Sequence, residues 1–216
     1  MTDAATQAAT GPVDGGTTGL SRRRAETRDR LIAAAVTVFA RVGVDQARVE
    51  DISEEAGYTR GAFYSNFTDK DELIVALLQR QLELSTSAMH TSLGQVLSSP
   101  LPDDFTRLVH DTLDVFDENM PDPDWMLAEL SLRLYARRNP AVATHLRAYE
   151  DQRMTSMVEV LGGAMARAGV RATIPMEHLI AIAMAIQTEC TVQDRVGSPP
   201  RDLMVSMLVG CIAPVR

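Results

Sequence analysis

The sequence is poor in the residues that disulfide, metal and membrane proteins need. Its two cysteines and four histidines show no HxxxH or HExxH spacing, which leaves a metal site only as an assembly of distant residues. Two cysteines are too few for a disulfide framework, so we expect Cys190 and Cys211 to be small core or interface residues. No segment has the roughly 20 consecutive apolar residues of a membrane span or the basic start and apolar core of a secretory signal. We therefore expect a cytoplasmic protein with no metal, cofactor or membrane segment.

Lysine is almost absent, and acidic residues exceed basic ones, which gives a net charge of −8. That balance argues against a nucleic-acid partner until its distribution is considered. Residues 21–48 hold seven arginines and three acidic residues, a local charge of +4. We interpret Arg22, Arg23 and Arg24 as a flexible basic arm that follows phosphates or enters a minor groove. A solvated run of charge without a partner is the alternative.

Strand patterns are lacking too, because sustained alternation of apolar and polar residues is absent and β-branched clusters are rare. Apolar residues instead recur every three or four positions, as from Leu31 to Val42, which predicts amphipathic helices. The expected helices cover residues 23–43, 49–56, 60–67, about 69–97, 103–119, from 123, 140–168, 175–194 and 201–212. Gly162-Gly163 leaves open whether residues 140–168 form one helix or two. The sequence thus predicts an all-α fold of about nine helices after a disordered Ala/Thr/Gly-rich tail at residues 1–20.

Aromatic residues make up 5% of the chain, yet four of them lie in the segment AGYTRGAFYSNF at residues 56–67. Gly57, Tyr58 and Thr59 form a tight turn between two short helices, as in a helix-turn-helix. Thr59 is also placed to cap the second of these helices. Together with the helix before them, the two short helices predict a compact three-helix unit.

The helix after this turn has two different faces. Its inward face, which packs on the first helix, carries Ala62, Phe63 and Phe67. Its outward face carries Arg60, Gly61, Tyr64, Ser65 and Asn66. Arginine pairs with guanine edges or phosphates, glycine permits close backbone approach, and the other three side chains offer contacts to phosphate, ribose or base. Lys70, at the start of the next helix, adds a cation for a phosphate. A helix-turn-helix that never meets DNA is the alternative.

Residues 50–73, EDISEEAGYTRGAFYSNFTDKDEL, closely resemble the DNA-binding signature of the TetR family of bacterial transcriptional regulators. The shared run is Ala-Gly, a turn residue, a Ser or Thr cap, Arg-Gly, a small residue, an aromatic, Tyr, two polar residues, Phe and Lys-x-x-Leu. Tyr58 departs from this pattern where Val is commoner, and Asn66 departs where His is frequent. Arg48 stands where a Thr usually caps the second helix, which weakens the cap or replaces it with a phosphate-binding cation.

The resemblance implies a helix-turn-helix DNA-binding domain at residues 21–68 and a helical effector-binding and dimerisation domain at residues 69–216. It implies a homodimer on a palindromic operator in double-stranded DNA and a small-molecule effector. Repression is the expected output, although the family also holds activators. The residues that we predict to contact DNA are Arg22, Arg23, Arg24, Arg48, Thr59, Arg60, Gly61, Ala62, Tyr64, Ser65, Asn66 and Lys70.

Two late helices, at residues 176–192 and 203–212, are apolar on more than one side. Such helices need two partners, and pairing both with their symmetry mates in a four-helix bundle would supply them. This pattern favours dimerisation, and a wholly intramolecular core is the alternative.

Methionine and aromatic side chains in the same half of the chain indicate a cavity for an apolar effector, because thioethers adapt their shape to bulky ligands. The residues that we expect to line it are Phe105, Val109, Phe116, Trp125, Met126, Glu129, Met154, Met157, Met184 and Gln187. Glu129 is a carboxylate among apolar neighbours. It is placed either to meet a cationic ligand or to pair with Arg133 one helical turn on.

Enzyme signatures are missing. The adjacent carboxylates Glu54–Glu55 and Asp103–Asp104 would point about 100° apart on a helix, so neither pair converges on one substrate. No nucleophile elbow, phosphate loop or metal motif is present, and we predict that the protein is not an enzyme. A helical ligand-binding protein that has lost DNA binding is a third possibility, and Arg60, Tyr64 and Lys70 argue against it.

Overall fold

The computed structural model describes residues 16–98, 105–118, 122–192 and 199–215. Within these residues the chain forms nine helices and one small sheet, which confirms the all-α prediction. The elements are α1 Gly16–Val42, α2 Val49–Glu55, α3 Arg60–Tyr64, α4 Lys70–Ser98, α5 Phe105–Glu118, α6 Pro123–Ala136, α7 Pro140–Arg167, β1 Val170–Ala172, α8 Met176–Val192, α9 Pro199–Cys211 and β2 Ile212–Pro214.

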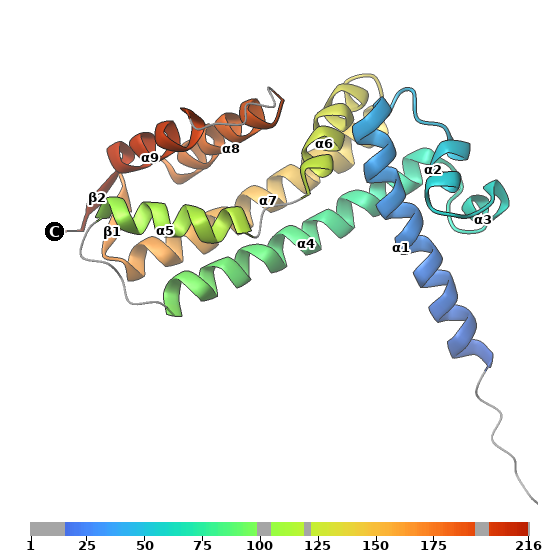
Figure 1. Cartoon of the computed structure of the whole chain (residues 1–216), viewed down its shortest axis with the longest axis horizontal. Helices are drawn as coiled ribbons and strands as arrows, with labels where there is room; N and C mark the ends of the chain where they lie inside the picture. The colour runs from blue at the N-terminus through green and yellow to red at the C-terminus, as the bar shows by residue number, and fades with distance from the viewer. Residues whose placement is uncertain (1–15, 99–104, 119–121, 193–198, 216) are drawn as a thin grey trace, which may run out of the picture.

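Two long helices, α4 and α7, run side by side along the molecule and connect its two ends (Figure 1). The 29 residues of α4 give it a length of about 43 Å at 1.5 Å per residue. Helices α1, α2 and α3 lie at one end, where α6 packs against α1, and α5, α8 and α9 lie toward the other (Figure 1). The molecule therefore has a helix-turn-helix end and a bundle end joined by continuous helices.

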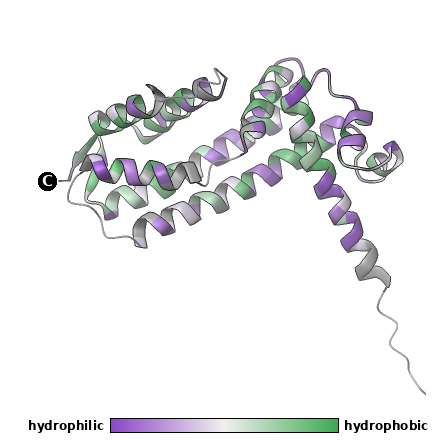
Figure 2. Ribbon diagram, viewed as in Figure 1, coloured by the Kyte–Doolittle hydropathy of each residue, from purple (hydrophilic) through white to green (hydrophobic). Residues whose placement is uncertain are grey.

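The main core lies where α1, α2, α3, α4, α6 and the start of α7 meet, and it joins the two predicted domains. Figure 2 shows this junction as apolar, whereas residues 21–30 of α1 are largely hydrophilic. The largest fully buried side chains include Phe39, Phe63, Phe67 and Trp125. The core crosses the predicted boundary near residue 68, so the end of α6 packs in one core with the helix-turn-helix.

Two predictions for the N-terminal region are wrong, the flexible basic arm and part of the disordered tail. Residues 16–20 continue α1, and Arg22, Arg23 and Arg24 are exposed on this helix instead of lying on a flexible segment. Arg22 forms an i,i+4 ion pair with Glu26 at 3.4 Å, which supports a helix locally. The apolar stripe begins only at Leu31, so the sequence pattern did not reveal the earlier turns. The predicted disorder of residues 1–15 lies outside the described residues.

Two further features differ from the sequence prediction, the end of α3 and the small sheet, and the continuity of α7 decides an alternative that the sequence left open. Helix α3 ends at Tyr64 because the Asn66 amide Nδ2 donates to the Ala62 carbonyl at 2.8 Å and closes the helix there. Helix α7 is continuous through Gly162 and Gly163. Strands β1 and β2 pair antiparallel, with Val170 opposite Pro214. No strand was predicted, because three residues are too few to show alternation and their pairing joins distant parts of the chain.

Candidate DNA-binding surface and ligand cavity

Helix α3 is held by its cap and by its aromatic inner face. The Thr59 hydroxyl accepts from the Ala62 backbone N–H at 3.3 Å, as the sequence predicted. Phe63 is 0% exposed, and its ring lies 5.6 Å from that of Phe67. Gly57 adopts a φ of 72°, a left-handed conformation that glycine enters without steric cost. The turn and the buried rings therefore set the direction in which the outer face points.

The outer face of α3 carries predicted DNA-contact residues, and the packing of the protein places few requirements on them. Tyr64 is 47% exposed and touches Phe63 edge-on, with ring centroids 5.4 Å apart. Arg60 is exposed, pairs with Glu50 at 2.9 Å and lies 5.4 Å from the Tyr64 ring. A Cβ on Gly61 would meet Thr59 Oγ1 at 3.7 Å, an ordinary contact. The described residues thus give no steric reason for glycine at this position.

Arginines of α1 support the C-terminal end of α3, a role that the sequence analysis missed. Arg24 donates to the Ser65 carbonyl at 3.1 Å, and Arg28 donates to the Asn66 carbonyl at 3.0 Å. The Arg28 guanidinium also lies 4.3 Å from the centre of the Phe67 ring. These cations satisfy carbonyls that a helix end leaves without partners. Arg24 and Arg28 of α1 therefore position α3 in addition to carrying charge.

Two predicted contacts, Asn66 and Lys70, are turned toward the protein. Asn66 is buried, whereas the sequence analysis placed it on the outer face. The Lys70 ammonium donates to the carbonyls of Val44 at 2.6 Å and Ala47 at 3.1 Å, and burial lowers its pKa. Lys70 thus ties the loop after α1 to the start of α4. The DNA contacts proposed for these two side chains stay predictions.

Arg48 begins α2 as an exposed residue, as its place in the sequence suggested. Its side chain has no acceptor for the helical N–H groups. The Asp51 carboxylate accepts from the Arg48 backbone N–H at 3.0 Å, so only the returning half of a capping box stabilises this helix start. The Arg48 side chain is left exposed on the surface.

The bundle end encloses a cavity of about 240 Å³ between α4, α5, α6, α7, α8 and α9. Six predicted residues line it: Trp125, Met126, Glu129, Met157, Met184 and Gln187. Val109 is buried but is not among the residues found to line the cavity, and neither is Met154. The side chains of Phe105 and Phe116 lie outside what the structure describes. Ser85, Met89, Ser92, Tyr149 and Arg153 also line the cavity and were missed.

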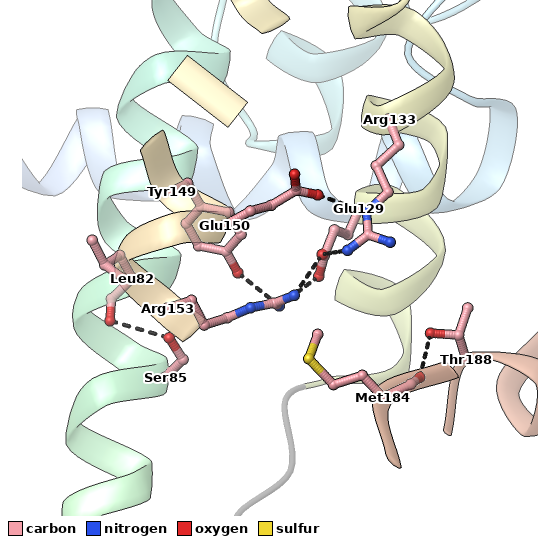
Figure 3. A network of polar contacts seen from close by, with 9 residues as sticks. All are labelled: Leu82, Ser85, Glu129, Arg133, Tyr149, Glu150, Arg153, Met184 and Thr188. Carbon is pink, nitrogen blue, oxygen red and sulfur yellow. Dashed lines mark hydrogen bonds and ion pairs between the residues drawn. The ribbon is translucent and has the colours of Figure 1, made fainter. Parts of the chain in front are cut away.

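A buried ion-pair network lies at one wall of this cavity (Figure 3). Arg153 meets Glu129 with two bonds, Nη1 to Oε2 at 2.9 Å and Nη2 to Oε1 at 3.0 Å. Arg133 donates to Glu129 at 2.8 Å and pairs with Glu150 at 3.1 Å. The pairing with Arg133 that the sequence left open is therefore present, and Arg153 adds a second cation. Burial lowers the pKa of Arg153, but Glu129 and Tyr149 together raise this pKa by more than burial lowers it, so the net shift is upward.

A family model described as "Bacterial regulatory proteins, tetR family" matches residues 31–77, from the apolar stripe of α1 into α4. A protein from Mesorhizobium loti described as a TetR-family transcriptional regulator has the same fold, with a TM-score of 0.67, 15% identity, and coverage of 87% of this chain and 96% of that one. The chain belongs to the TetR family.

Curated relatives of this TetR-family protein match mainly over the helix-turn-helix. The regulator SrpR of Pseudomonas putida is 47% identical over 62 residues, which cover 27% of this chain and 29% of SrpR. The nicotine-responsive repressor HdnoR of Paenarthrobacter nicotinovorans is 30% identical over 116 residues, 53% of this chain and 57% of HdnoR. The chain thus spans about a third to just over half the length of these two relatives. The family consists of regulatory proteins, which confirms the prediction that the chain is not an enzyme.

Helix α6 links the cavity of this TetR-family protein to its helix-turn-helix. Glu129 and Trp125 line the cavity, while the Ser131 hydroxyl accepts from the Val44 backbone N–H at 2.7 Å. Tyr135 donates to Asp71 at 2.9 Å, and Arg138, just after α6, pairs with Asp45. These partners are far apart in the sequence, so no local pattern could have revealed them. A shift of α6 would change both the cavity and the loop that follows α1.

The described residues contain no helix long and apolar enough to cross a membrane. Within the same part of the chain, no group of three histidine, cysteine, aspartate or glutamate side chains is arranged to hold a metal ion. Cys211 is a free, partly buried thiol.

Proposed function

We propose that this TetR-family protein is a DNA-binding transcriptional repressor that acts as a homodimer in the cytoplasm. It binds a palindromic operator, and a small, largely apolar effector releases it. The observation that carries the proposal is the outer face of α3, where Tyr64 is exposed and Gly61 has no steric role within the described chain. Both features cost stability or solubility in isolation, and both are explained by close approach to a DNA groove. The nicotine-responsive repressor among the relatives supports repression with a small-molecule response.

The test of this function is binding of the purified full chain to the DNA upstream of its own gene, titrated across salt. Affinity should fall steeply with salt, because each neutralised phosphate releases counterions. Unrelated DNA of equal length sets the non-specific level. Binding to both DNAs with the same affinity and salt slope, there and in a genome-wide selection, would overturn the proposal.

Gly61→Ala separates the fold from DNA recognition. Alanine should stabilise α3 by up to about 1 kcal/mol, because glycine is the poorer helix former. The added Cβ would meet DNA instead of protein, so operator affinity should fall at least tenfold. Chemical denaturation and operator titration check the two effects, with Gly94→Ala as the control, because an added Cβ at this glycine of α4 would meet nothing within 4 Å. Unchanged operator affinity in Gly61→Ala would contradict close backbone approach to DNA.

Dimerisation is supported by the outward faces of α8 and α9. Ala181, Ile182 and Ala185 of α8 are exposed, and so is Leu203 of α9, whereas Leu179 and Ile180 face inward. Small residues beside large apolar ones allow two copies of the α8–α9 pair to approach closely in a four-helix bundle. In such a dimer two α3 helices would lie about 34 Å apart, one turn of DNA.

Introducing two negative charges into this apolar face should produce a monomer. Ile182→Glu with Leu203→Glu would bury carboxylates at the symmetry axis, and operator affinity should fall at least a hundredfold because each monomer reads a half-site alone. Sedimentation at micromolar concentration checks the state. Leu134→Glu, on an exposed leucine of α6, is the matched control. A double variant that still sediments as a dimer would place the interface elsewhere.

Release from the operator requires an effector that binds one conformation better than the other. The residues of α6 that line the cavity, and its contacts to the α1–α2 loop and to the start of α4, support α6 as the element that the effector moves. An effector that changes the position of α6 would change the spacing of the two recognition helices, so that they no longer fit successive major grooves.

A further inference from the structure

The polar groups that line the cavity indicate which polar end group its ligand carries, in addition to a largely apolar body. Most of the wall is apolar, with Leu113, Trp125, Met157 and Met204 among the residues that line it. The polar groups gather in the Glu129–Arg133–Arg153 network and in a few hydroxyls. Whether those groups offer hydrogen-bond acceptors or donors decides which end group a ligand must carry.

The acceptor capacity of Glu129 is largely taken. Its Oε1 accepts from Arg133 at 2.8 Å and from Arg153 at 3.0 Å, and its Oε2 accepts from Arg153 at 2.9 Å. Two guanidinium groups therefore neutralise this carboxylate, as Figure 3 shows. Two guanidinium groups already pair with Glu129, so a cationic ligand could pair with this carboxylate only by displacing one of them.

Two polar atoms of residues that line the cavity, Ser92 Oγ and Arg133 Nε, by contrast, have no hydrogen-bond partner among the described residues. The Ser92 hydroxyl is buried in a side chain that is 0% exposed, lines the cavity and has no hydrogen-bond partner among the described residues. The Tyr149 hydroxyl already accepts from Arg153 at 3.1 Å. Burial raises the pKa of Tyr149 to about 12, so its O–H stays a donor at neutral pH. Arg133 Nε lies 3.1 Å from Glu150 but without the direction of a hydrogen bond. An unpaired buried donor is costly, and an acceptor on a ligand would relieve that cost.

We propose that the effector is a small amphipathic carboxylate, with an apolar body among the methionines and an acidic end that accepts from Ser92, Tyr149 and the Arg133 Nε. This rests on the proposed function of the cavity as the effector site. The carboxylate is favoured over a neutral acceptor because the hydrogen bonds that arginine makes to carboxylates are stronger and often bidentate. The cavity of about 240 Å³ has room for an apolar body, and simple eight-carbon chains serve as probes for it.

Three eight-carbon probes that differ only in their end group test the inference: octanoate, octan-1-ol and octylamine. Calorimetric titration of the full chain at neutral pH should show octanoate binding at least tenfold tighter than the alcohol, and the amine binding most weakly. Saturating octanoate should also raise the melting temperature, because it binds the folded state. Tighter binding of the alcohol or the amine would overturn the acidic end group while leaving an apolar effector cavity in place. Failure of all three probes to bind would overturn both.

Ser92→Ala connects the binding to this cavity. The variant should fold as well as the parent, because it removes a buried hydroxyl that lacks a partner. Its affinity for octanoate should fall several-fold more than its affinity for octan-1-ol. Ser87→Ala, on an exposed serine of the same helix, is the matched control and should bind both probes as the parent does. Equal losses for the two probes in Ser92→Ala would show that Ser92 does not meet the acid, and would overturn its assigned role.

Discussion

Phe63→Ala should lower the free energy of unfolding by about 3–5 kcal/mol, the range for removing a fully buried phenylalanine. Phe63 is 0% exposed and belongs to the main core, and its ring contacts both Phe67 and Tyr64. The cavity left behind would lie between α1 and α3, so the recognition helix would lose its support before the bundle end does. Denaturant unfolding at a fixed protein concentration measures the effect.

Tyr64→Ala is the matched control, since it removes the neighbouring ring from the opposite face. Tyr64 is half exposed, so stability should change by about 1 kcal/mol or less. Specific operator binding should be lost, because the ring and hydroxyl offered to the groove are gone. A Phe63→Ala variant of parental stability would contradict the packing of α3 described above. A Tyr64→Ala variant of parental affinity would remove this side chain from the DNA contacts.

Glu129→Ala should be comparably damaging, at about 3–5 kcal/mol, because it leaves the guanidinium of Arg153 buried without its charge partner. Glu129 is 8% exposed and accepts two of the three hydrogen bonds that orient Arg153, the third being to the neutral Tyr149 hydroxyl. Arg133 retains Glu150 as a partner, so the loss concentrates on Arg153. Denaturant unfolding, again at fixed concentration, gives the difference.

The double variant Glu129→Leu with Arg153→Met provides the control for this effect. It replaces the buried pair by apolar side chains of similar size, which is often neutral or stabilising. It should therefore recover most of the stability that Glu129→Ala loses. If the double variant is as unstable as the single one, packing around Glu129 rather than the unpaired charge sets the cost.

The helix-turn-helix could be predicted from the sequence because its determinants are local. The turn at Gly57, the cap at Thr59 and the inward rings of Phe63 and Phe67 act within a dozen residues of one another, and helical spacing assigns each to a face. Asn66 was assigned to the wrong face because the helix was predicted to continue past Tyr64, whereas the Asn66 side chain itself ends it.

The cavity could be predicted only in part. Trp125, Met126, Met157 and Met184 follow from apolar spacing on single helices, and each lines the cavity. Arg153 does not follow, because its partner Glu129 lies on another helix and 24 residues earlier. A charged residue in an amphipathic pattern is expected to face solvent, and only the packing of α7 against α6 turns this one inward. Ser92 was missed for the same reason.

The sequence by itself determined the helical fold and the reading face of α3, because apolar periodicity, caps and turn glycines act over a few residues. The tertiary structure decided which charges became buried partners and which groups remained without any. It also decided that Lys70 ties down a loop, and that α6 touches both the cavity and the helix-turn-helix. The physical reason is distance along the chain: a hydrogen bond or ion pair between helices depends on how they pack, and no short stretch of residues specifies that packing.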